Sequence, residues 1–255
     1  MKEKKGSIIQ TVAGLVILIA GIVLCINTYV VIVNKAYAVS LLTAIVGAVI
    51  LISGLYSLFS KNEKKPIDAK VIAQAALCAA LCYVGATFIK IDIPVGTERT
   101  MFHFGNVFCV LAALLLGGTW GGLAGAVGMT ISDLTTAYVT SAPKTFFLKL
   151  CIGLIVGFVA HRLFKLSKEH SVKYVTIATV VSSVCGMLFN VVADPIVGYF
   201  YKTYLLGVPQ DLAKALAKVG AVTTSVNAVI AVVVASIIYL ALRPVMKKSD
   251  MLRDL

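Results

Sequence analysis

The sequence predicts an all-α polytopic membrane protein, on the basis of its apolar content, its low charge and the length of its apolar runs. Hydrophobic residues make up 60% of the 255 residues, charged residues make up 13%, and the mean hydropathy is +0.98. These values lie outside the range of soluble domains. Helical residues rise about 1.5 Å each, so roughly 20 apolar residues cross a bilayer core of about 30 Å.

Two apolar segments, residues 7–27 and 37–59, come before a charged linker that ends at Pro66. The first apolar run continues to Val33, which is longer than the core of about 7–15 residues in a cleavable signal peptide. We therefore expect this segment to be retained in the membrane. Residues 1–66 are predicted to form an N-terminal two-helix membrane unit with a charged linker.

Six further apolar segments are predicted to form a helical core over residues 67–255, which ends in a basic tail. The segments are residues 69–90, 104–116, 119–137, 145–164, 174–197 and 215–242. Segment 104–116 is short, and Gly117 and Gly118 follow it directly. Because neighbouring glycines favour a tight turn, segments 104–116 and 119–137 are predicted to form a hairpin with almost no polar loop.

Basic residues cluster beside the apolar segments, as the determinants of membrane topology do. Under an eight-helix arrangement, the clusters in residues 2–5, 61–70, 162–173 and 243–253 fall on one side of the membrane. The more positive side is the cytoplasmic one, so both termini are predicted inside. Topology therefore explains the net charge of +12, and no basic and aromatic patch or recognition motif indicates nucleic-acid binding.

The sequence carries no recognisable catalytic or metal-binding motif. No phosphate-binding G-x-x-x-x-G-K-[ST] loop, G-x-S-x-G elbow or H-E-x-x-H pair occurs, so neither an enzyme nor a self-contained ATPase is predicted. Cys78 and Cys82 share a helix face without histidines or carboxylates beside them. They are expected to be buried hydrophobic residues, and no cofactor or metal is predicted.

Polar and ionisable side chains at membrane depth form the candidate solute site, because such groups are costly there unless they are paired or face a polar cavity. Counted at about 1.5 Å per residue, Asp133, Lys149 and Asn190 all fall in the outer half of the membrane. The predicted substrate-binding residues are His103, Asn106, Asp133, Tyr138, Lys149, Asn190, Asp194 and Asn227.

Most of these residues also have a purely structural explanation. Asp133 and Lys149 can form an interhelical ion pair, and buried pairs are weak evidence of stabilisation. The corresponding structural roles are a hydrogen bond between helices for Asn190 and for Asn227, a helix end for Asp194, a helix cap for His103 and an aromatic-belt anchor for Tyr138.

Three motifs in a fixed order resemble a known family. They are the alanine face AQAALCAAL, the glycine hairpin LLLGGTWGGLAGAVGMTISDL with Asp133 near its end, and APKTFFLKLCIGLIVG with Lys149. From Ala69 to Val245 the chain resembles the substrate-binding S component of an energy-coupling factor (ECF) vitamin transporter. The two leading helices depart from the minimal six-helix pattern of that family.

The resemblance implies a non-enzymatic protein in the plasma membrane of a prokaryote that captures a vitamin or vitamin precursor from outside. It also implies docking through the alanine face of the first core helix onto a shared transmembrane coupling subunit, driven by two ATPases of the ATP-binding-cassette class. The corresponding residues are Ala75, Ala76, Ala79 and Ala80. The competing predictions are a self-sufficient secondary transporter of a small polar solute and a scaffold without a ligand.

Overall fold

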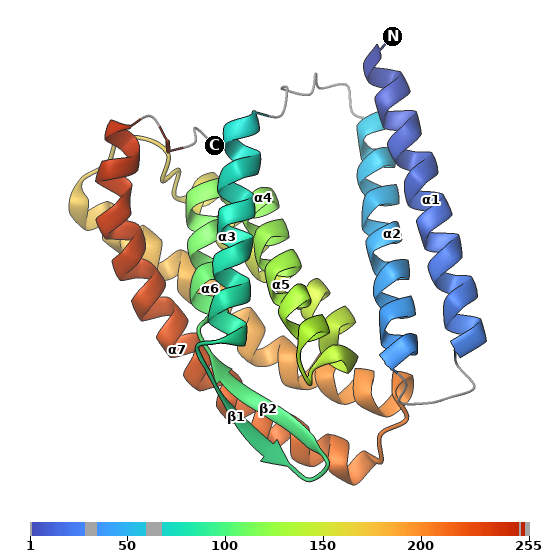
Figure 1. The fold of residues 1–255 in the computed structure, drawn as a ribbon. Coiled ribbons are helices and arrows are strands. Elements are labelled where there is room, and N and C mark those ends of the chain that lie inside the picture. Colours follow the sequence, from blue (N-terminus) through green and yellow to red (C-terminus); the bar gives the residue numbers. More distant parts are fainter. Residues whose placement is uncertain (1, 29–34, 60–67, 250, 253–255) are drawn as a thin grey trace. The chain divides into compact units, whose positions relative to one another are not determined.

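The structure is a computed structural model that describes residues 2–28, 35–59, 68–249 and 251–252. Two compact units make up the chain: Met1–Ile67 with Val139–Pro143, and Asp68–Tyr138 with Lys144–Leu255 (Figure 1). Across the described residues, seven helices are long and apolar enough to cross a membrane. This confirms the predicted all-α polytopic class, to which the second unit adds one short β-hairpin.

In the first unit, α1 (Lys2–Thr28) and α2 (Lys35–Phe59) form an antiparallel pair held at short distance by glycines. Gly14 lies against the backbone of Leu51, and Gly47 lies against the backbone of Leu18. Glycine allows such close approach because it has no side chain, which is a common way for helices to associate in lipid.

The second unit, here called the core, begins with α3 (Ala69–Thr87), which Asp68 caps by accepting a hydrogen bond from the Lys70 amide at 3.0 Å. The predicted helix 69–90 is too long by three residues. The chain instead enters an antiparallel hairpin of β1 (Lys90–Val95) and β2 (Glu98–His103). A two-residue turn joins the strands, and its first residue, Gly96, has φ +60°, as a type II′ turn requires.

Next, α4 (Gly105–Thr135) turns back on itself at Gly117, whose φ of 80° and ψ of 176° interrupt the helix. Gly125 lies against Cys109, although 16 residues along a straight helix would separate them by about 24 Å. The predicted helical hairpin is therefore confirmed. It also accounts for the difference between eight predicted segments and seven observed helices.

The first arm of α4, residues 105–116, occupies the centre of the core, and every residue in it except Phe108 is buried. The second arm packs on α5 (Ala142–Gly157), where Gly118 and Gly122 meet Gly157 and Gly153 at backbone contact. Because the paired positions run in opposite order, the two helices are antiparallel.

The rest of the core consists of helices with short π-helical extensions. After η1 (Val139–Ser141), which belongs to the first unit, and α5, the π-helix η2 (Phe158–Leu163) leads to α6 (Val172–Phe200). A second π-helix, η3 (Tyr201–Leu205), precedes α7 (Gln210–Lys248). The β-hairpin lies at one end of the core beside α7, and the turn within α4 lies at the opposite end (Figure 1).

Candidate solute-binding site

The site residues predicted from the sequence lie at the end of the core that carries the β-hairpin, and all of them are buried or half-buried. His103 ends β2, Asp133 lies near the end of α4, and Lys149 lies on α5. Asn106 lies near the start of α4, Tyr138 follows that helix, Asn190 and Asp194 lie on α6, and Asn227 lies on α7.

Asp133 bonds to a neighbouring helix through a residue that was not predicted from the sequence. The Thr145 hydroxyl of α5 donates to Asp133 Oδ2 at 2.5 Å, and both side chains are buried. Asp133 also interacts electrostatically with the ammonium groups of Lys144 and Lys149 and with the carboxylate of Asp194. A buried carboxylate with nearby cations is therefore fixed between α4 and α5.

Lys149 points to α6 and not to Asp133. Its Nζ donates to Asn190 Oδ1 at 3.4 Å, and both residues are buried. Between Lys149 and the carboxylates in the described part of the chain, no ion pair closer than 4.0 Å forms. A direct Asp133–Lys149 ion pair is therefore not what the structure contains.

An ion pair joins two helices to each other, and a hydrogen bond adds a third helix. The contact includes two further residues that were not predicted as part of the site, Lys144 and Thr224. Lys144 Nζ donates to Asp194 Oδ1 at 2.8 Å, and the Thr224 hydroxyl donates to Asp194 Oδ2 at 3.0 Å. Lys144 could have been predicted as a site residue, because it is one of three formal charges in the apolar sequence between Met101 and Gly157. The threonines had none, because a lone hydroxyl carries no pattern in sequence.

Asn227 joins the β-hairpin to α7. Its Oδ1 accepts from the His103 amide at 3.0 Å, and its Nδ2 donates to the Met101 carbonyl at 3.1 Å. One turn earlier on α7, the Thr223 hydroxyl lies 3.0 Å from that of Thr100. Both ends of the Asn227 amide are thus used by the protein itself.

Tyr138 anchors the same hairpin through its hydroxyl group. Its hydroxyl lies 2.8 Å from Asp92 Oδ1 and 3.1 Å from the Thr100 carbonyl, and Lys90 Nζ lies 5.1 Å from its ring centre. Burial and the hydrogen bond to Asp92 raise the pKa of Tyr138. The phenol therefore stays protonated and fixes the position of the strands.

His103 and Asn106 lie where the hairpin meets α4. His103 Nδ1 accepts from the Gly105 amide at 3.1 Å, and burial together with the charge of Lys149 lowers the pKa of His103 to about 3. The ring is therefore neutral at physiological pH, with its proton on Nε2. Asn106 is 1% exposed, and its Oδ1 has no hydrogen-bond partner among the described residues.

The alanine face divides into two ridges. Ala75 is buried and Ala79 is half-buried, with the Ala79 carbonyl against Gly128 of α4. Ala76 and Ala80 are exposed. Only the second ridge is therefore directed away from the packed interior of the core.

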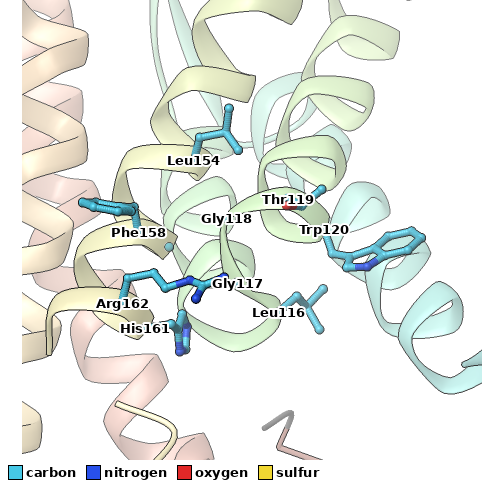
Figure 2. Close-up of a pocket in the computed structure, with 10 residues that line it drawn as sticks. Leu116, Gly117, Gly118, Thr119, Trp120, Leu154, Phe158, His161 and Arg162 are labelled. Carbon is cyan, nitrogen blue, oxygen red and sulfur yellow. The ribbon is translucent and has the colours of Figure 1, made fainter. Parts of the chain in front are cut away.

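A pocket of about 460 Å³ lies at the other end of the core, around the Gly117 turn (Figure 2). Its walls come from the turn itself and from the junction of α5 and η2. The lining residues are Leu116, Gly117, Gly118, Thr119, Trp120, Leu154, Gly157, Phe158, His161 and Arg162. This pocket is separate from the polar cluster near the β-hairpin.

Comparison with known proteins agrees with the family resemblance of the sequence. Residues 67–244 match the family described as ECF-type riboflavin transporter, S component. A Pyrococcus woesei protein named "Uncharacterized protein in gap 3'region" is 34% identical over 74 residues, which cover 29% of this chain and 49% of that protein. The chain thus spans about half the length of this curated relative, and no solved structure matches. Because the family match covers most of the chain, the protein belongs to the S component family of ECF-type riboflavin transporters.

Proposed function

We propose that the protein captures a vitamin from outside a prokaryotic cell and delivers it through an ATP-driven ECF complex, with both termini in the cytoplasm. Family membership carries the proposal, since this family serves vitamin uptake and is not a family of enzymes. Riboflavin is the first vitamin to test, because the matching family is described by that name.

The polar cluster near the β-hairpin is proposed as the vitamin site. Asn106 offers an acceptor that is unpaired among the described residues, and Lys149 offers an ammonium group that donates to Asn190 at 3.4 Å. A flavin ring and its ribityl chain present carbonyl oxygens, an imide N–H and hydroxyl groups, which such residues can bond. Asp133 and Asp194 are proposed to position the site, since threonine and lysine partners already hold them.

Asn106→Leu provides the sharpest test, because it separates binding from folding. Removing an unpaired buried acceptor should leave thermal stability unchanged or raise it, whereas removing a ligand contact should weaken affinity by about 1–3 kcal/mol, roughly one to two decades in Kd. Flavin fluorescence quenching measures the affinity, and thermal unfolding in detergent measures the stability.

Lys149→Met should likewise weaken riboflavin binding, since it keeps the apolar stem and removes the ammonium group. Lys173→Met is the matched control, because Lys173 is exposed near the start of α6 at the opposite end of the core. Unchanged affinity in both Asn106→Leu and Lys149→Met would contradict this placement of the site. If wild-type protein does not bind riboflavin, mass spectrometry of material that co-purifies with it identifies the vitamin.

The exposed ridge of α3 is proposed to dock the shared coupling subunit. Close backbone contact between helices in lipid requires small residues, so a bulky side chain at Ala76 or Ala80 should block assembly. Ala76→Trp should abolish uptake in cells that contain the coupling subunit and both ATPases, while the purified variant still binds the vitamin. Leu188→Trp is the control, because Leu188 of α6 is 60% exposed. Loss of vitamin binding in Ala76→Trp would assign this ridge to internal packing.

A further inference from the structure

The pocket at the Gly117 turn contains a cation that the described part of the chain leaves without a partner. Arg162 lines the pocket, and its side chain extends from η2 towards Gly117 (Figure 2). No hydrogen bond or ion pair joins the Arg162 side chain to any described residue. By contrast, His161 beside it is buried and fully engaged, with Nε2 3.0 Å from the Leu114 carbonyl and Nδ1 3.1 Å from Ser167 Oγ.

The same end of the core has a large excess of positive charge. The basic side chains there are Lys70, Arg162, Lys165, Lys168, Lys173, Arg243, Lys247 and Lys248. The described carboxylates at this end are Glu169, which pairs with Lys247, and Asp68, which caps α3. An occupant of the pocket would therefore meet an uncompensated cation in a positive field, which selects an anion.

The walls of the pocket select an amphipathic anion. Leu154 and Phe158 are 42% and 55% exposed on the outer surface of the helix, and Leu163 just beyond them is 60% exposed. Trp120, half-buried on the other side of the turn, is typical of the membrane interface. Acyl chains can lie along these apolar side chains while a charged headgroup enters the pocket.

We propose that this pocket binds the phosphate headgroup of an anionic phospholipid from the leaflet on the basic face of the protein. Anionic lipids concentrate at basic segments on the cytoplasmic side of membrane proteins, and basic pockets between helices hold their headgroups. A bound lipid would connect the α4 turn to η2, next to the backbone contact between Gly118 and Gly157. The inference does not depend on which vitamin the protein carries.

Purified full-length protein in nanodiscs of phosphatidylcholine, with and without phosphatidylglycerol, tests the proposal. A ligand that binds the folded state raises the melting temperature. Phosphatidylglycerol should raise the melting temperature of the wild type by several degrees and remain bound in native mass spectrometry. Arg162→Gln should lose at least tenfold in retained lipid, whereas Lys173→Gln, which removes the same charge outside the pocket, should match the wild type.

A second variant keeps the test decisive if Arg162→Gln is unstable. Thr119→Trp fills the pocket from an exposed lining position and leaves every charge in place, so it should also lose the lipid. Equal loss in Arg162→Gln and Lys173→Gln would overturn the proposal in favour of general surface charge. If inorganic phosphate alone raised the melting temperature as much as phosphatidylglycerol does, the proposal would be overturned in favour of a soluble anion. No preference for phosphatidylglycerol, combined with lost uptake in Thr119→Trp, would assign the pocket to a protein partner.

Discussion

Hydroxyl groups in the core bond in two different ways, and the difference separates packing from the polar cluster. In α6, the hydroxyls of Thr179, Ser182 and Ser183 donate to the carbonyl four residues earlier on the same helix. Thr145 and Thr224 instead donate across to carboxylates on neighbouring helices. A helix carbonyl is the ordinary partner of such a hydroxyl, so a bond to another helix indicates that the carboxylate needs a donor.

Thr145→Val should destabilise the protein by about 1–3 kcal/mol, because it leaves the buried Asp133 carboxylate without this donor while preserving the shape of the side chain. Thermal unfolding in detergent measures the change. Thr176→Val is the matched control, since the Thr176 hydroxyl donates to the Val172 carbonyl of its own helix. Equal melting temperatures for Thr145→Val and wild type would show that Asp133 does not depend on this hydroxyl.

His103 should make stability depend on pH. Its folded pKa of about 3 is below the value of about 6.5 expected in the unfolded chain, so the unfolded state binds more protons between these values. Stability should therefore fall as pH falls through this window, by about 2 kcal/mol from pH 7.5 to pH 5.

His103→Asn should reduce this pH dependence of the melting temperature, since the amide oxygen can accept from the Gly105 N–H in place of Nδ1 and does not titrate. An unchanged profile in His103→Asn would contradict the assignment.

The sequence predicted polar residues at membrane depth, which the structure buries in the core, but it could not predict their partners. Burial of Asp133, Lys149 and Asn190 follows from their place in apolar segments. Their contacts depend on how each helix is rotated about its axis, and spacing along one helix does not fix the rotation of the next. Asp133 and Lys149 consequently do not pair with each other. Asp133 instead bonds to Thr145, and Lys149 bonds to Asn190.

Among the structural elements, the helical hairpin of α4 could be predicted from the sequence, whereas the β-hairpin could not. Two neighbouring glycines after an apolar run predicted the α4 turn, and Gly117 has the backbone conformation that requires glycine. The β-hairpin was missed because its first strand continues the apolar run of α3. Its alternating Ile91, Ile93 and Val95 span only a few residues, too few to outweigh the preceding helix.

Gly117→Ala should destabilise the core by about 1–3 kcal/mol, because φ of 80° and ψ of 176° strain any residue with a side chain. Gly220→Ala gives the opposite expectation. An added methyl group there meets nothing within 4 Å, and alanine is the better helix former, so stability should stay level or rise by up to about 1 kcal/mol. Chemical or thermal unfolding of the two variants measures both effects, and a stable Gly117→Ala would exclude strain at the turn.

For the molecule as a whole, the family match and the compact units follow nearly the same boundary. The match begins at residue 67, and the second unit begins at Asp68. The predicted division into a two-helix unit over residues 1–66 and a substrate-binding core over residues 67–255 stays a prediction about function. The core has a hydrophobic interior of its own, as a unit that folds independently requires.

A chain that lacks residues 1–66 should therefore insert into the membrane and bind the vitamin with the affinity of the full protein. Binding to the purified truncated chain and uptake in cells with the coupling subunit measure the two roles separately. Preserved binding with lost uptake would assign the N-terminal helices to assembly. Lost binding in a folded truncated chain would contradict the division.

The first arm of α4 has a consequence for biosynthesis. Its residues 105–116 span about 18 Å, well short of the bilayer core of about 30 Å, and other helices enclose it almost completely. A segment of that length has too little apolar surface to move from the translocon into the lipid by itself. We expect both arms to partition into lipid together, as one preassembled hairpin closed at Gly117. A pause of the ribosome before the second arm is made, or a mutation that disrupts the second arm, should then leave the first arm outside the membrane.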